Sequence, residues 1–287
     1  MNSLLQQPRH RARTLRQQGF TLVELAIVLA VIGLIIGAVA IGKDVQRNAE
    51  YTKIKNKFID QWEQAYNQYY QRTGVVLGDS QTAPQNMVNG ARFLAADAAN
   101  RSGRDMTGVT PPNAICRAAA GQGMPRGFTA GTDPDLRVLM NRVGIRMPPG
   151  RAEGFEDRYV YLDSNGNPQE VQVCFQWNRP LANGSDNSLG DGAGNVMVIT
   201  GLTPDLARSL DQMIDGKPDA REGRFRQQGI ANNADSAGGN SGTANAPGSE
   251  WHANNRQQIT ANAAGGDGRT FDEDQVAIVT AIYKMNQ

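Results

Sequence analysis

The longest feature of the hydropathy pattern is an unbroken apolar run near the N-terminus. Residues 25–42 read LAIVLAVIGLIIGAVAIG and carry no charge. With residues 20–23 upstream, the run reaches the roughly 20 residues that an α-helix needs to cross the hydrocarbon core of a bilayer. The sequence therefore predicts one membrane-spanning helix over residues 20–43.

The helix is predicted to continue beyond the membrane. Residues 43–72 contain neither Pro nor Gly, and Gly74 follows as a stop signal. Apolar and aromatic side chains recur at helical spacing in this segment, at Tyr51, Ile54, Phe58, Trp62, Ala65 or Tyr66, and Tyr69. Because such a stripe is typical of core packing, we predict an amphipathic continuation over residues 44–73.

The pattern after Gly74 is mixed. Residues 88–98 and 134–143 predict short helices, and residues 158–163 and 170–177 predict two strands joined by a turn at 164–167. A third strand is predicted over 195–201 and a final one over 275–285. Thr203, Pro204 and Asp205 predict the start of a helix that extends to about Asp215. Residues 232–268, rich in Gly, Asn, Ala and Ser, predict a long mobile insert. The sum is an α+β fold with a long N-terminal helix packed on an antiparallel sheet head, residues 74–287.

Composition narrows the class of protein. The chain has 287 residues, of which 39% are hydrophobic and 20% charged, and its mean hydropathy is −0.49. These values exclude a multi-pass membrane protein and a wholly disordered chain. The formal net charge is +1, but residues 1–19 hold four arginines and no acid. By the positive-inside rule this basic leader stays in the cytoplasm, so the head lies outside it.

One charge stands inside the apolar segment. Glu24 follows Gly19, Phe20, Thr21, Leu22 and Val23, and a carboxylate costs about 3 kcal/mol at the centre of a membrane helix, less near its end. An acid in this position predicts a functional site with a partner. The alternative is a side chain at interfacial depth that reaches the lipid headgroups.

The string QQGFTLVEL at residues 17–25 resembles the processing site of type IV prepilins and pseudopilins. The resemblance implies that leader 1–19 is removed by cleavage after Gly19, that Phe20 is then N-methylated, and that Glu24 is retained for assembly. In a filament, Glu24 would meet the new α-amine of a neighbouring subunit. This chain departs from many family members in having Ile41 in place of Pro near the end of the apolar run. We therefore predict any bend or local unwinding at Gly33, Gly37 or Gly42.

The resemblance also implies a function and its partners. The chain would be a structural subunit of a type IV pilus or of a type II secretion-like pseudopilus, and not an enzyme. It would depend on a prepilin peptidase/methyltransferase, other pilin or pseudopilin subunits, an assembly ATPase and an inner-membrane platform protein. It would sit in the bacterial inner membrane as a single-pass protein before joining a filament in the periplasm or at the cell surface. The alternative is a membrane-anchored binding, adhesion or DNA-uptake module that uses its head loops.

Cys116 and Cys174 are the only two cysteines. An extracytoplasmic head would lie in an oxidising compartment, which favours a disulfide over two separately buried thiols. Neither histidine supports catalysis, since His10 lies in the leader and His252 in the low-complexity insert. We expect no resident cofactor.

Two further patterns each allow two interpretations, an ordinary structural one and a binding site. The loops 163–167 and 186–191 offer oxygen ligands for calcium, but they lack the twelve-residue pattern with a closing Glu, so solvated turns are favoured. Residues 101–158 hold nine arginines against six acids. This excess could line a DNA-binding face, but without interleaved aromatics an ordinary solvated surface is favoured over nucleic-acid binding.

Overall fold

The computed structural model describes residues 20–96, 104–106, 108–117, 124, 126–180, 193–220, 223–228, 251, 256–260 and 269–285. The chain divides into two compact units, residues 1–47 and residues 48–287. In its described part the first unit is helical, and the second unit contains both sheets and the shorter helices.

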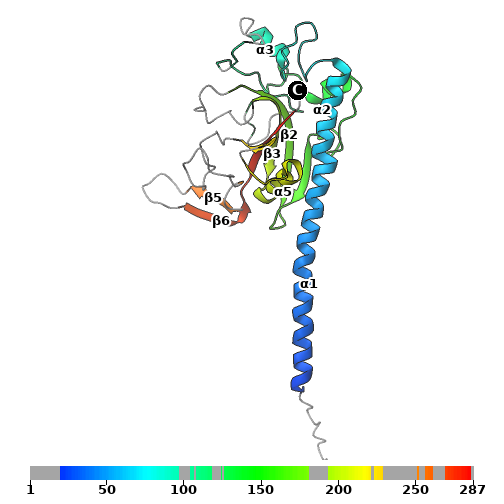
Figure 1. Cartoon of the computed structure of the whole chain (residues 1–287), viewed down its shortest axis with the longest axis vertical. Helices are drawn as coiled ribbons and strands as arrows, with labels where there is room; N and C mark the ends of the chain where they lie inside the picture. The colour runs from blue at the N-terminus through cyan, green and yellow to red at the C-terminus, as the bar shows by residue number, and fades with distance from the viewer. Residues whose placement is uncertain are drawn as a thin grey trace, which may run out of the picture. The chain divides into compact units, whose positions relative to one another are not determined.

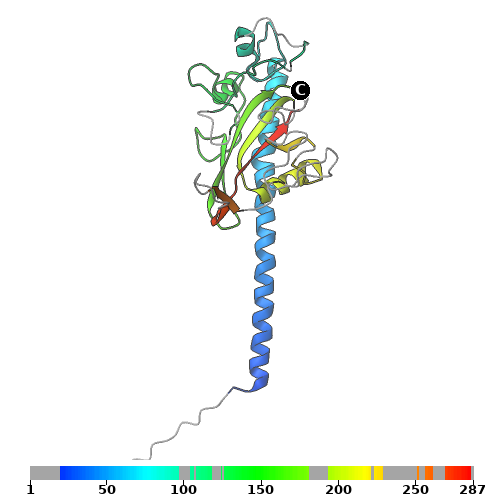
Figure 2. The ribbon, with the colours of Figure 1, turned by 90° about the vertical axis from the view of Figure 1, so that its left-hand side faces the viewer.

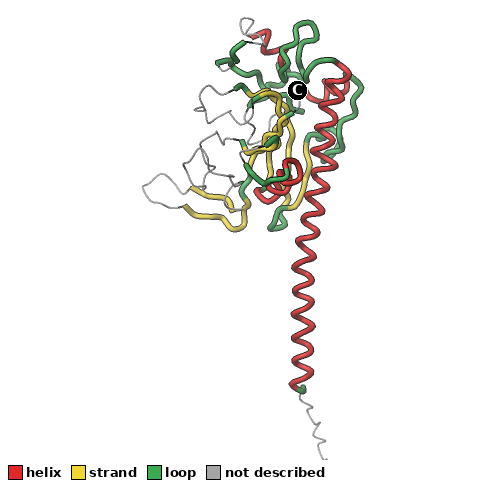
Figure 3. Tube along the Cα trace, in the orientation of Figure 1, coloured by secondary structure: helices red, strands yellow, loops and turns green. Residues whose placement is uncertain are grey.

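The N-terminal helical segment extends from Leu22 to Thr73 without a break (Figures 1 and 3). It consists of α1 (Leu22–Ile54), a π-helical stretch η1 (Lys55–Ile59) and α2 (Asp60–Thr73). Gly74 ends it in the left-handed conformation, with φ of 73°, and donates its N–H to the carbonyl of Tyr70. The predicted long helix and its end point are confirmed, because glycine alone adopts this terminating conformation without strain.

The predicted unwinding at Gly33, Gly37 or Gly42 was wrong, since helix α1 passes through all three residues. A glycine costs a helix about 1 kcal/mol, but peptide groups left without partners would cost more. The helical geometry changes instead at η1, where Phe58 and Ile59 are both fully buried. A wider turn brings two consecutive apolar side chains into the core of the head.

Aromatic side chains of the helix form one wall of the head core. The predicted stripe is buried from Tyr51 to Tyr69. Trp62 and Tyr66 both meet the ring of Phe175, at centroid distances of 6.1 and 5.2 Å, and Phe58 lies 5.5 Å from Tyr159. The interpretation of this stripe as core packing is therefore confirmed.

The other wall is a five-stranded antiparallel sheet with strand order β1-β2-β3-β7-β4. Its strands are β1 (Arg158–Leu162), β2 (Pro168–Asn178), β3 (Gly194–Leu202), β4 (Phe225–Gln227) and β7 (Val279–Lys284). The predicted hairpin of β1 and β2 is confirmed, with Leu162 paired to Pro168 across the turn, so β2 begins two residues before the predicted strand. In Figure 2 the red strand β7 lies beside the yellow-green β3, although some 80 residues separate them in the chain.

Three short helices complete the described head. Helix α3 (Gly90–Ala96) and helix α4 (Leu136–Arg142) fall within the two predicted segments. Helix α5 (Pro204–Asp215) begins with Thr203 as its N-cap, whose hydroxyl accepts the N–H of Leu206, and Gly216 ends it in the left-handed conformation. Its predicted bounds are confirmed.

The C-terminal part departs from the prediction in two ways. The single strand expected over 275–285 is divided into β6 (Arg269–Val276) and β7, because the chain breaks at Ala277 and Ile278 to leave one sheet and enter another. Within the predicted insert 232–268, β5 (Arg256–Thr260) pairs with β6, and Trp251 is fully buried. Of this insert, Trp251 therefore enters the core of the head, while β5 belongs to a separate two-stranded sheet.

Candidate functional site

The N-terminus of α1 is closed by a reciprocal capping arrangement. The Thr21 hydroxyl accepts the backbone N–H of Glu24 at 3.2 Å. In return, Glu24 Oε2 accepts both the backbone N–H and the hydroxyl of Thr21, each at 2.9 Å. This is a capping box, in which two otherwise unpaired helix donors are satisfied by side chains three residues apart. The sequence analysis singled out Glu24 but missed Thr21, which the T-x-x-E spacing could have revealed.

The surface that follows is apolar and exposed along the described part of α1. Phe20 is 90% exposed, and large apolar side chains of α1 from Leu22 to Val45 are all exposed. The segment is long and apolar enough to span a membrane. Exposed apolar surface on this scale marks contact with lipid or protein. Gly19, on the other side of the predicted cleavage point, lies outside the described residues.

The second site predicted from the sequence is a disulfide in the head. Cys116 and Cys174 are bonded, with their Cα atoms 4.7 Å apart. Next to it, Ile115 and Phe175 exchange both backbone hydrogen bonds, at 2.8 and 3.0 Å. Cys174 lies on the face of β2 opposite Phe175, where it packs with Ala114 and Cys116. The bridge therefore ties the segment before α4 to the sheet from the side away from α2.

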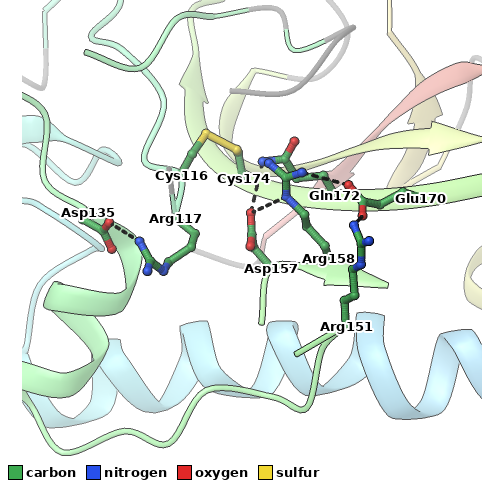
Figure 4. Close-up of polar contacts among 9 residues, drawn as sticks. All are labelled: Cys116, Arg117, Asp135, Arg151, Asp157, Arg158, Glu170, Gln172 and Cys174. Atoms are coloured by element: carbon green, nitrogen blue, oxygen red, sulfur yellow. Dashed lines mark hydrogen bonds and ion pairs between the residues drawn. A yellow bond between two sulfur atoms is a disulfide. The ribbon is translucent and has the colours of Figure 1, made fainter. Parts of the chain in front are cut away.

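Arginine–carboxylate pairs surround the disulfide (Figure 4). Arg117 contacts Asp135 at 2.8 Å, while Arg151 and Arg158 share Glu170 at 2.7 and 2.9 Å. Asp135 is also the N-cap of α4, because its Oδ1 accepts the backbone N–H of Arg137. The arginine-rich stretch 101–158 is thus partly neutralised by acids from its own sequence and from β2.

Asp157 lies at the centre of this network and is almost fully buried. Burial raises the pKa of its carboxyl group, and the hydrogen bond from Gln172 Nε2 at 3.0 Å and the charge of Arg158 partly oppose that rise. A buried acid with a neutral amide partner stabilises one arrangement of loop and strand.

The first of the two candidate calcium loops uses its carboxylate internally. Asp163 accepts the backbone N–H groups of Asn165 and Asn167 at 2.9 and 2.8 Å, and the side-chain amide of Gln169 at 3.0 Å. Among the described residues no group of three or more His, Cys, Asp or Glu side chains is placed to hold a metal. The second loop, 186–191, lies outside the described residues.

A buried carboxylate on α5 was missed by the sequence analysis. Asp211 Oδ2 accepts the indole N–H of Trp251 at 2.8 Å and the backbone N–H of Asp219 at 2.6 Å. Arg208 also donates to the carbonyl of Trp251 at 2.9 Å. The sequence did offer one signal for this contact, a single tryptophan in a Gly- and Asn-rich segment. A side chain of this size and apolarity is usually buried.

Comparison with known proteins agrees with the N-terminal geometry. No curated protein and no solved structure matches the chain. Residues 14–40 match the family described as the prokaryotic N-terminal methylation motif. This match spans the end of the leader, Phe20, the Thr21–Glu24 capping box and most of the apolar run. The chain therefore carries the signature of type IV prepilins and pseudopilins, and with it the N-terminal segment of a pilin-like precursor.

Proposed function

We propose that the chain is a structural subunit of a type IV pilus or of a type II secretion-like pseudopilus. The observation that carries the proposal is an uncovered apolar helix that begins with the methylation motif. In this role the leader 1–19 is removed at Gly19–Phe20, and Phe20 becomes the methylated first residue. Neighbouring helices, together with lipid before assembly, cover the exposed apolar surface.

Glu24 has a specific task in this proposal. Within one chain its only described hydrogen-bond partner is Thr21, three residues away. The α-amine exposed by cleavage would be a stronger partner, because the two opposite charges satisfy each other in an apolar medium. The pairing between neighbouring subunits would fix their axial register.

Membrane placement and partners follow from the same role. The basic leader stays cytoplasmic, where a prepilin peptidase/methyltransferase acts, and the disulfide-bonded head is extracytoplasmic. An assembly ATPase and an inner-membrane platform protein would drive its incorporation with other pilin or pseudopilin subunits. The function is mechanical and requires no catalytic residue.

Mass spectrometry of the N-terminus tests the proposal. The full chain is expressed with and without a prepilin peptidase, and the intact mass and N-terminal peptide are measured. We expect a peptidase-dependent N-terminus at Phe20, heavier by one methyl group. Gly19→Leu should abolish processing, whereas Glu24→Gln should leave cleavage intact and reduce incorporation into filaments. An uncut chain, or a cut elsewhere, would make residues 20–43 an ordinary anchor.

A further inference from the structure

The head contains a groove to which the proposed filament function assigns no role. It lies beside α2, has a volume of about 1010 Å³, and is bounded on its other side by α4 and by the loop of residues 144–156. Its lining includes Gln61, Gln64, Gln68 and Arg72 from α2, and Arg146 and Glu153 from the opposite side. This volume is at the upper end of the range for ligand sites in proteins.

The loop that forms the second wall is held along the helix. Arg72 Nη1 donates to the carbonyls of Val143 and Gly144, each at 2.8 Å, near the end of α2. After the loop, Tyr159 meets Phe58 before the start of α2. The loop therefore runs antiparallel to α2, and Figure 3 shows loop segments, in green, beside the helix. Because both ends are fixed, the groove is preformed.

Close backbone packing holds the C-terminal half of this loop in place. Gly150 lies so near the backbone of Phe155 and Glu156 that a Cβ atom there would come within 2.5 Å of both. The N–H of Arg151 also donates to the carbonyl of Arg158 at 2.6 Å. These contacts set the position of Glu153 and Glu156 at the end of the groove nearest Phe58.

The two ends of the groove carry opposite charge. Arg72 uses its guanidinium on backbone carbonyls, and Arg146 is exposed; neither has a carboxylate partner among the described residues. At the other end Glu153 is 92% exposed, and its ion pair with Arg137, which also lines the groove, is long, at 3.7 Å. Glu156 adds a second carboxylate, so this end keeps a net negative charge. An anion is favoured near Arg72 and Arg146, and a cation near Glu153.

The helix wall between the charged ends presents amides. Gln61, Gln64 and Gln68 lie on one side of α2, and none of the three has a hydrogen-bond partner among the described residues. Each side-chain amide offers donors and an acceptor, which match the groups of a peptide bond. The lining contains no aromatic side chain on which a nucleotide base could stack.

We propose that this groove binds an extended polypeptide segment of a partner protein, with an acidic residue at the Arg72 and Arg146 end and a basic residue at the Glu153 end. Gln61 to Arg72 spans about 16 Å of helix, which is the length of about five extended residues. The glutamine amides would bond the backbone of the segment, and the charged ends would set its direction. The proposal goes beyond filament assembly and does not depend on it.

Selection from a peptide library tests the proposal directly. Random eight-residue peptides displayed on phage are selected against the full chain in detergent micelles and counter-selected against the variant Gln64→Ala/Gln68→Ala/Arg146→Glu. We expect enriched sequences with Asp or Glu at one end and Lys or Arg at the other. Recovery of the same peptides on both proteins, or of apolar peptides alone, would overturn the proposal.

A charge-matched pair of variants provides the second measurement. The best enriched peptide is titrated by fluorescence anisotropy against wild type, Arg146→Glu and Arg92→Glu, the last being an exposed arginine outside this groove. Arg146→Glu should weaken binding at least tenfold and Arg92→Glu less than twofold, with the intact disulfide and circular dichroism confirming the fold of each. Equal effects of the two variants, or oligo-dT binding that is as tight as peptide binding and is lost in Arg146→Glu, would refute a peptide site.

Discussion

Replacing Asp211 by Asn should remove a pH-dependent part of the stability of the head. The side chain is fully buried on α5, and its Oδ1 has no hydrogen-bond partner among the described residues. Burial, together with the nearby carboxylates of Asp215 and Asp219, raises its pKa to about 7, against 3.8 for an ordinary aspartate. The nearby cation, Lys217, contacts Asp219 at 2.8 Å and is therefore already engaged.

The sign of the effect follows from proton linkage. Because the pKa of Asp211 is higher in the folded than in the unfolded state, the folded chain holds this proton more tightly between pH 4 and 7. Stability from this group is fully present below pH 3.8, falls as the pH rises towards 7, and stays low above 7. The full shift corresponds to about 4 kcal/mol, and relaxation of the protein and water penetration around the buried charge should leave about 2 kcal/mol.

Urea unfolding of the full chain in detergent micelles, followed by tryptophan fluorescence between pH 5 and 8, measures the effect. Wild type should lose about 1 kcal/mol across this interval relative to Asp211→Asn, because only part of the total of about 2 kcal/mol falls above pH 5. The amide keeps the acceptor for Trp251 and Asp219 and imitates the protonated acid, so its profile should be flatter and the variant more stable than wild type at pH 8. The control Asp205→Asn, in the first turn of the same helix, should retain the wild-type slope. Parallel profiles for wild type and Asp211→Asn would refute the reasoning.

Four further variants test the packing of the head by the same unfolding measurement. Trp62→Ala should cost about 3 to 5 kcal/mol, because a fully buried indole against Phe175 leaves a cavity; a loss below about 1 kcal/mol would contradict this packing. Replacing Cys116 and Cys174 by Ala should cost about 4 kcal/mol, since the bridge closes a loop of 58 residues, and reductant should then affect only wild type. Gly201→Ala should prevent stable folding, because φ is +78° and the new Cβ would overlap the Glu170 carbonyl. Gly166→Ala, with similar φ but open space, should cost only about 1 kcal/mol.

Much of the fold was predictable because the local sequence patterns agree with the observed burial of the same side chains. The stripe from Tyr51 to Tyr69 has the period of a helix, and the same side chains form the core wall. The β1–β2 hairpin and α5 were bounded by their own turn and cap residues, such as Thr203 and Gly216. Where a segment is specified by neighbours within a few residues, the sequence suffices to place it.

The features that the sequence analysis did not predict depend on partners that are distant in the chain. Trp251 enters the core because Asp211, 40 residues earlier, supplies an acceptor, and composition around Trp251 gives no hint of that partner. Arg151 and Arg158 pair with Glu170, an acid outside residues 101–158 that a count of charges over that stretch does not include. The break at Ala277 and Ile278 likewise reflects competition between two sheets, which a strand pattern cannot record.

The resemblance to the N-terminal methylation motif was recognised from residues 17–25 alone, but the local geometry of this segment carries a separate prediction. The Thr21 hydroxyl both accepts the N–H of Glu24 and donates to its carboxylate, so Thr21→Val removes two of the three hydrogen bonds of the capping box. Loss of an N-cap costs about 1 kcal/mol, which corresponds to roughly fivefold faster hydrogen exchange at the first-turn amides. Mass-resolved exchange of the full chain in micelles should show this for Thr21→Val and not for Thr21→Ser, which keeps the hydroxyl. If both variants exchange like wild type, Thr21 does not hold Glu24. The carboxylate would then be free before assembly, and a neighbouring amine would not have to displace an existing partner.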